Sequence, residues 1–158
     1  MMNCRDRRVS IQNELIRKYN HPVLSFCMNI PGPVKTNEQI RKAFDSGKAE
    51  LLKALSAHNI SVLHTEEFHE PSGDELIMAL DAPAGDIKTL ATEIEESHPL
   101  GRLFDMDVIG IDGMKLSRGT YRKCIICGCQ AQECARSRKH SVEELQAKIV
   151  ELLNQFGV

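Results

Sequence analysis

Helix-like and strand-like patterns alternate along the chain. Apolar residues recur at helical spacing in residues 37–58, as at Ile40, Phe44 and Leu51, and this spacing predicts a helix. Short runs rich in Val, Ile and Phe, bounded by Pro, Gly or Asp, predict strands. The same criteria predict helices over residues 5–19, 37–58, 84–97 and 141–156, and strands over residues 23–30, 60–69, 75–80 and 102–109.

The order of these elements predicts the fold class. Apart from the terminal helices it reads strand, helix, strand, strand, helix, strand, which is the split βαβ or ferredoxin-like order. We therefore expect an α+β fold with a βαββαβ sheet and added N- and C-terminal helices. A length of 158 residues favours a single domain over 1–158, with a cysteine-rich segment at about 118–140 and a closing helix at about 141–156.

Two carboxylates interrupt the last apolar run. Asp105 and Asp107 alternate with Phe104, Met106 and Val108. In a strand every second side chain lies on the same face of the sheet, so the two aspartates share one face. The two acidic Cβ atoms are then about 7 Å apart, from a rise of about 3.3 Å per residue. Carboxylates so placed can hold Mg²⁺ together with phosphate oxygens. The alternative is a solvated strand face with two chance acids.

Composition excludes several classes of partner. The net charge is −2 with an isoelectric point near 6.3, and only 4% of residues are aromatic, with no Trp. A protein without excess positive charge or stacking rings is not expected to bind nucleic acid. Neither a membrane-length apolar run nor a signal-peptide core is present in the sequence. We therefore expect a cytoplasmic protein that does not contact membranes.

The cysteines form a second candidate site. Cytoplasmic cysteines are expected to be reduced or metal-bound rather than disulfide-linked. Four of the six fall within eleven residues, and a histidine follows; Cys-x₂-Cys spacing with a further Cys and a His can bind Zn²⁺ in a structural site. The alternative is a cluster of small buried side chains. These residues are Cys124, Cys127, Cys129, Cys134 and His140.

Four segments resemble a known family. They are Asn-Ile-Pro-Gly-Pro-Val-Lys at 29–35, Gly-Arg-Leu-Phe-Asp-Met-Asp-Val at 101–108, Leu-Ser-Arg at 116–118, and the cysteine segment 122–140. Together, and in this order, they resemble the citrate lyase prosthetic-group transferases, also called holo-citrate lyase synthases or the CitX family. The resemblance covers roughly residues 5–156.

The resemblance implies an activity and a set of site residues. Members of this family transfer phosphoribosyl-dephospho-CoA from its triphosphate donor, triphosphoribosyl-dephospho-CoA, to a serine of the citrate lyase acyl carrier protein (the γ chain), with release of diphosphate. This is a nucleotidyltransferase reaction. It implies Asp105, Asp107 and Arg102 as catalytic residues, with both aspartates as Mg²⁺ ligands. The residues expected to bind the substrates are Gly32, Lys35, Gly101, Arg118 and Arg136. Because Cys129 lies outside the family pattern, the zinc set reduces to Cys124, Cys127, Cys134 and His140.

Some assignments stay open at this point. Two alternative functions stay open. One is a related transferase for another acyl carrier protein, such as that of malonate decarboxylase. The other is a non-catalytic interaction module whose fold is stabilised by zinc. His98 and His140 are candidates for the general base. Asp81, at the end of a neighbouring strand, is a weak candidate for a third metal ligand.

Overall fold

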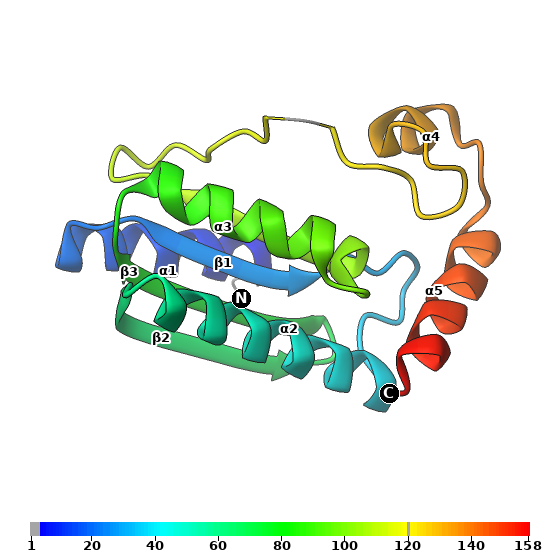
Figure 1. The fold of residues 1–158 in the computed structure, drawn as a ribbon, viewed down its shortest axis with the longest axis horizontal. Helices are drawn as coiled ribbons and strands as arrows, with labels where there is room; N and C mark the ends of the chain where they lie inside the picture. Colours follow the sequence, from blue (N-terminus) through cyan, green and yellow to red (C-terminus); the bar gives the residue numbers. More distant parts are fainter. Residues whose placement is uncertain (1–3, 120) are drawn as a thin grey trace.

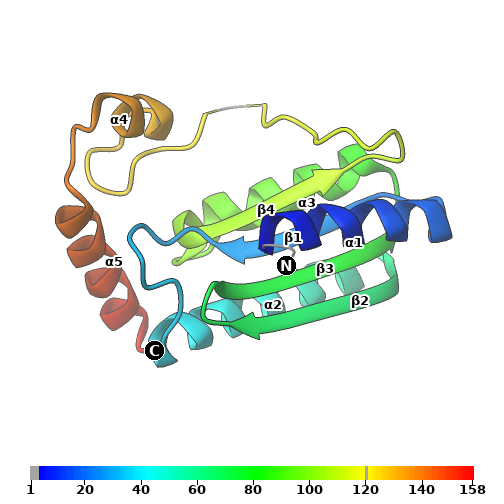
Figure 2. The ribbon, with the colours of Figure 1, turned by 180° about the vertical axis from the view of Figure 1, so that it is seen from behind.

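The computed structural model describes residues 4–119 and 121–158. Its four-stranded sheet has the order β2-β3-β1-β4, and every neighbouring pair is antiparallel (Figures 1 and 2). The strands are β1 (Val23–Met28), β2 (Ser61–Glu70), β3 (Gly73–Asp81) and β4 (Phe104–Ile109). The helices are α1 (Cys4–Tyr19), α2 (Glu38–Ala57), α3 (Ala84–Ser97), α4 (Ala131–Ser137) and α5 (Val142–Phe156), with a 3₁₀ turn η1 (Gly101–Leu103). The predicted α+β class and ferredoxin-like element order are confirmed.

The two faces of the sheet are covered differently. Helices α2 and α3 pack on one face and bury the main core, to which β4 contributes Phe104, Met106 and Val108. On the opposite face α1 covers a smaller apolar cluster around Val23 and Ile109 (Figure 2). Asp105 and Asp107 belong to neither cluster, as strand alternation predicts.

Gly47 lets α2 approach the sheet. A Cβ atom at this position would lie 2.7 Å from Cζ of Phe26 and 2.9 Å from Cζ of Phe104. The ring of Phe26 also stacks on Phe44, with centroids 4.8 Å apart. A glycine inside a helical pattern can mark a break in the helix or a close packing contact. Helix α2 is continuous, so the close contact is the explanation.

The chain after β4 differs most from the predicted elements. Residues 114–117 run back beside β4: Lys115 forms a bridge with Ile109, the backbone N–H of Leu116 donates to the carbonyl oxygen of Val108 at 2.9 Å, and the N–H of Gly110 donates to that of Met114 at 2.9 Å. The short helix α4 was not predicted. Helix α5 begins as expected, because Ser141 and Glu144 form a capping box. Among the described residues no helix is long and apolar enough to cross a membrane.

The segment between β4 and α4 places the candidate site. It returns along the outer edge of β4 and past α3 (Figures 1 and 2). Two arginines hold it there: Arg118 pairs with Glu95 of α3, and Arg122 donates to the carbonyl oxygen of Gly101 at 3.0 Å. The outer edge of β4 therefore faces this segment rather than another strand.

Candidate functional site

Asp105 and Asp107 lie on the same face of β4. In the register, Asp105 is opposite Cys27 and Asp107 is opposite Ser25 of β1. Both carboxylates are half-buried and line one cavity of about 780 Å³ between β4 and the segment that returns along it. They are accessible from this cavity and are not enclosed in the core.

A row of polar side chains crosses this face of the sheet beside Asp105. Glu75 of β3, Cys27 of β1 and Asp105 of β4 are register partners, and Arg8 of α1 donates from Nε to Glu75 Oε1 at 2.7 Å. Burial, reinforced by Asp105, raises the pKa of the Cys27 thiol to about 12. Burial also raises the pKa of Asp105, and Asp107 adds to this shift. A cation near the two aspartates would offset the cost of their charge.

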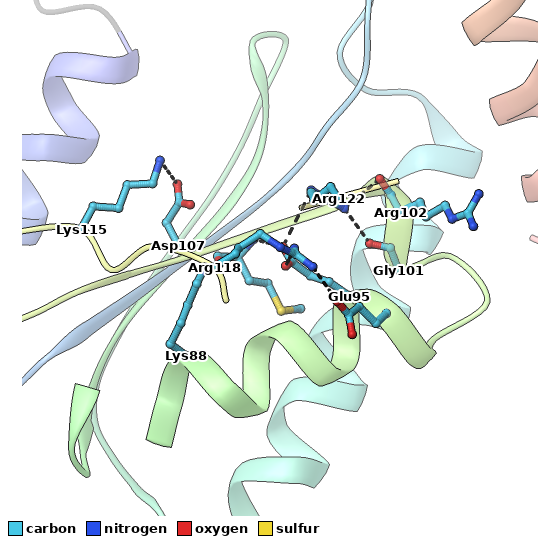
Figure 3. Close-up of polar contacts among 10 residues, drawn as sticks. Lys88, Glu95, Gly101, Arg102, Asp107, Lys115, Arg118 and Arg122 are labelled. Atoms are coloured by element: carbon cyan, nitrogen blue, oxygen red, sulfur yellow. Dashed lines mark hydrogen bonds and ion pairs between the residues drawn. The ribbon is translucent and has the colours of Figure 1, made fainter. Parts of the chain in front are cut away.

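Side chains of α3 form hydrogen bonds with the backbone at the outer edge of β4. The backbone N–H of Met106 donates to Glu95 Oε2 at 2.9 Å, and Lys88 Nζ donates to the Met106 carbonyl oxygen at 3.2 Å (Figure 3). Glu95 also pairs with Arg118 and, at 3.8 Å, with Arg122. Burial raises the pKa of Glu95. The strand that carries both aspartates is thus tied to α3 through its backbone.

Positive groups surround the two aspartates. Lys115 Nζ lies 3.3 Å from Asp107 Oδ2 (Figure 3), and Arg118 and Arg122 line the same cavity. Arginine forks and lysine ammonium groups bind phosphate oxygens, whereas carboxylates bind hard cations. The cavity therefore offers both kinds of group that a metal–polyphosphate ligand requires.

Arg102 lies apart from the aspartates. Its side chain is exposed on η1 and donates to the carbonyl oxygen of Cys124 at 3.4 Å. It lines a second cavity of about 590 Å³ beside the cysteine segment, but not the cavity of Asp105 and Asp107. The catalytic role expected for Arg102 stays a prediction.

Gly101 has a packing role. A Cβ atom on Gly101 would lie 2.1 Å from the carbonyl oxygen of Glu95, at the end of α3. The Pro-Gly-Pro loop is also held by local contacts. Gly32 has a φ of +87°, and Lys35 Nζ donates to the carbonyl oxygen of Ile30 at 2.7 Å. These contacts give each of the three residues a structural role, and the substrate-binding roles expected for them stay predictions.

Arg136 is exposed on α4 and pairs with Glu133 at 3.3 Å.

His98 packs against the rings of Phe104 and Phe156, and its Nδ1 accepts from the backbone N–H of Leu100 at 3.0 Å. Burial lowers the pKa of His98. These contacts account for His98 as a structural residue at the end of α3.

Asp81 lies far from the two candidate metal ligands. Glu75 is the residue of β3 in line with Asp105, and Asp81 follows it by six positions, about 20 Å at the rise of a strand. The side chain of Asp81 contacts His21 Nε2 at 3.0 Å. The antiparallel pairing therefore makes Asp81 unsuitable as a third ligand of a metal held by Asp105.

The four side chains expected to bind zinc lie together. The ligand atoms of Cys124, Cys127, Cys134 and His140 are all within 4.8 Å of one another. Nε2 of His140 is buried and has no hydrogen-bond partner among the described residues. The backbone N–H of Ile126 donates to Cys124 Sγ at 3.4 Å. This geometry can hold a metal ion such as Zn²⁺.

Sequence reasoning missed the residues that support the edge of β4. Lys88 and Glu95 are buried charges that follow the apolar positions Ile87 and Ile94 on α3. Charged residues seven positions apart beside the apolar stripe of a helix are a detectable signal, because buried charges are rare unless they are paired. Their partner, the backbone of Met106, cannot be identified from the sequence.

Comparison with known proteins gives consistent matches along the chain. Residues 1–156 match the family described as "Apo-citrate lyase phosphoribosyl-dephospho-CoA transferase". A protein of that name from Citrobacter koseri is 36% identical over 158 residues, covering 98% of this chain and 86% of its own. A "probable" transferase of this name from Vibrio cholerae is 36% identical over 155 residues, covering 95% and 87%. One from Escherichia coli is 34% identical, covering 98% and 86%.

Proposed function

Since the chain belongs to the family of apo-citrate lyase phosphoribosyl-dephospho-CoA transferases, we propose that it is the nucleotidyltransferase that modifies the citrate lyase acyl carrier protein. It transfers phosphoribosyl-dephospho-CoA from triphosphoribosyl-dephospho-CoA to a serine of the carrier. The observation that supports this most is the cavity lined by Asp105 and Asp107 together with Lys115, Arg118 and Arg122.

The reaction forms one phosphodiester and breaks one phosphoanhydride. The serine Oγ bonds to the α-phosphorus of the donor, the bond from that phosphorus to the bridging oxygen breaks, and diphosphate leaves with the electron pair. The hydroxyl proton passes to solvent or to a base. Such a transfer depends on positioning and on neutralising phosphate charge. In the proposal, Lys115, Arg118 and Arg122 bind phosphate oxygens around the reacting phosphorus.

Asp105 and Asp107 are proposed to hold Mg²⁺. Both supply hard oxygen donors, which suit this ion, and both are half-buried in the cavity. A Mg²⁺ ion held there would neutralise charge on the triphosphate and on the leaving diphosphate. The negative charge of the two aspartates excludes a triphosphate that carries no cation.

The cysteine cluster is proposed to hold a structural Zn²⁺ through Cys124, Cys127, Cys134 and His140. A site with four protein ligands has no open position for catalysis. The metal would fix residues 122–140 against the rest of the single domain proposed for residues 1–158. Reduced thiols of this kind are typical of the cytoplasm, where we expect the protein to act.

The remaining predicted residues have supporting roles in this proposal. Gly32 and Lys35 shape the loop after β1, next to η1, and Gly101 sets the approach of η1 to α3. Arg102 contacts the donor from its position on η1. Arg136 is exposed on α4, where it can contact the acidic surface usual for acyl carrier proteins.

Intact-protein mass spectrometry tests the proposed function. The protein is incubated with apo acyl carrier protein of citrate lyase, the triphosphate donor and Mg²⁺. We expect a mass gain on the carrier equal to one phosphoribosyl-dephospho-CoA unit, located to its serine by peptide mapping, and release of one diphosphate. A carrier with that serine changed to alanine is the matched control. Modification of the malonate decarboxylase carrier alone, or no modification of either carrier, would overturn the assignment.

A further inference from the structure

The second cavity, of about 590 Å³, differs from the first in its charge. It is enclosed by η1, residues 122–125, α4 and α5. Among the described residues that line it none is Asp or Glu, whereas four are positively charged: Arg102, Arg122, Lys123 and Arg138. Because the whole chain carries a net charge of −2, this is a local excess of positive charge, and it favours an anionic ligand.

The walls of this cavity are largely apolar. The apolar residues that line it include Leu103, Ile125, Leu145 and Ile149. Val142, at the start of α5, also lines it and is 45% exposed. Small-molecule sites are typically concave, mostly apolar and between about 300 and 1,000 Å³, with a few polar groups that fix the ligand. A ligand that fits this cavity has an apolar or flat part and a short anionic part.

The two cavities adjoin each other. Asn29, Arg122, Ala131 and Ala135 line both, so one ligand can extend from the carboxylates of the first cavity into the second. Arg122 is positioned between them by hydrogen bonds of 3.0 Å from Nη2 to the carbonyl oxygens of Gly101 and Arg102. A ligand with two chemically different halves would match this pair of cavities.

We propose that the second cavity binds the dephospho-CoA half of the donor, while the triphosphate end lies beside Asp105 and Asp107. This rests on the proposed function. The adenine ring and the pantetheine arm are suited to the apolar walls, and the internal diphosphate is suited to the positive side chains of Arg102, Lys123 and Arg138, which line this cavity. The proposal also explains why Arg102 lies apart from the two aspartates.

The cysteine cluster forms part of the same wall. Cys124, Cys134 and His140 line the cavity and also belong to the proposed zinc site. A metal ion there would hold the start of the cysteine segment next to α4 and the residues that lead into α5. The structural metal would thereby set the shape of the donor pocket.

A pair of tryptophan variants on α5 tests the proposal. Val142 lines the cavity, and Val150, on the same helix and 48% exposed, does not. Val142→Trp fills the cavity, whereas Val150→Trp adds the same side chain elsewhere. We expect Val142→Trp to weaken binding of dephospho-CoA at least tenfold in isothermal titration calorimetry, and Val150→Trp to leave it within twofold. In transfer assays the KM for the donor should rise for Val142→Trp while kcat changes little.

The outcomes separate this inference from the proposed function. Equal affinity of both variants for dephospho-CoA, or no saturable binding to the unaltered protein up to about 1 mM, would overturn the inference even if transfer occurs. Loss of carrier binding with unchanged nucleotide binding in Val142→Trp would assign the cavity to the carrier and also overturn it. Weakened dephospho-CoA binding without any transfer by the unaltered protein would support the pocket and contradict the proposed reaction.

Discussion

Glu95 Oε2 accepts a hydrogen bond from the backbone N–H of Met106 at 2.9 Å. A side chain of α3 therefore takes the place that a neighbouring strand would have at the outer edge of β4. Lys88 of the same helix donates to the carbonyl oxygen of Met106. Both charged side chains are buried. Met106 lies between Asp105 and Asp107, so this pair of contacts fixes the backbone from which both candidate metal ligands project.

Glu95→Ala is therefore expected to destabilise the protein strongly. The variant leaves the Met106 N–H without its partner and removes the carboxylate that pairs with Arg118 and Arg122. Breaking a buried pair costs about 3–5 kcal/mol, measurable by urea denaturation. The matched control is Glu96→Ala, because Glu96 also pairs with Arg118 but is exposed, and it should cost less than about 1 kcal/mol. Equal losses would contradict the role of Glu95.

Asp105→Asn and Asp107→Asn should abolish most transfer while the fold is retained. Each change removes one charged donor to Mg²⁺ and leaves a side chain of nearly the same shape in a half-buried position. We expect the rate to fall about a hundredfold or more, equivalent to about 3 kcal/mol in the barrier. Asp45→Asn, an exposed carboxylate on α2, should leave the rate unchanged. Transfer by either variant at the original rate, with unchanged circular dichroism, would reject the metal-binding role.

The elements that could be predicted from the sequence are those in which apolar residues recur at the regular spacing of a helix or a strand. Apolar spacing located α2, α3 and α5, and alternation placed Asp105 and Asp107 on one face of β4. The cluster of Cys124, Cys127, Cys134 and His140 was also found from the sequence, since its members fall within 17 positions of the chain, although the family resemblance was needed to set Cys129 aside. In each case neighbouring residues contain the information.

The features that could not be predicted depend on contacts between distant segments. Helix α4 carries no apolar period, and η1 replaces the expected start of β4 because Gly101 packs against the end of α3. The separation of Arg102 from Asp105 likewise follows from the turn at η1. Glu95 looked like an ordinary helix residue, and only the tertiary structure shows its partner in β4.

Removal of metal should expose thiols that are otherwise protected. We expect about one Zn²⁺ per chain by elemental analysis. With metal bound, iodoacetamide should modify Cys129 and spare Cys127, although both are exposed, and a chelator should then make Cys127 equally reactive. Cys27 should react slowly in both states, because its burial raises the pKa of its thiol to about 12. A rate at Cys127 that does not depend on the chelator would exclude the metal site.

Stability should fall as the pH rises through the titration of His69. Burial alone lowers the pKa of this histidine, but hydrogen bonds to Asp74 and Glu67 outweigh burial, so the pKa is raised overall. A raised pKa means that the folded protein binds the proton more tightly. The stabilising contribution of protonated His69 to the free energy of unfolding is therefore full below the unfolded pKa of about 6.5, and it is lost above the folded pKa.

Urea denaturation on both sides of this pH range measures the effect. His69→Gln should remove the part of the pH dependence that His69 causes, up to about 1 kcal/mol because these pairs are partly exposed. His58→Gln, at an exposed histidine that ends α2, is the control and should keep the original profile. A His69→Gln profile identical to that of the unaltered protein would show that other groups cause the dependence.

Gly101→Ala separates a packing role from a substrate-binding role for the glycine of the family motif. The new Cβ would lie 2.1 Å from the carbonyl oxygen of Glu95 and 2.8 Å from that of Ile94. These are backbone atoms that cannot rotate away, so α3 or η1 must shift, and we expect a loss of about 3 kcal/mol or more. The shift also moves Glu95 away from Met106, so the edge of β4 loosens.

Gly119→Ala is the matched control, because a Cβ there meets nothing within 4 Å. It should keep full stability in thermal and urea denaturation. If Gly101 served only to admit a phosphate, Gly101→Ala would fold as stably as Gly119→Ala and raise the KM for the donor. A large drop in stability with Gly101→Ala alone would instead show that this glycine acts by bringing α3, and with it Glu95, up to the strand that carries the two aspartates.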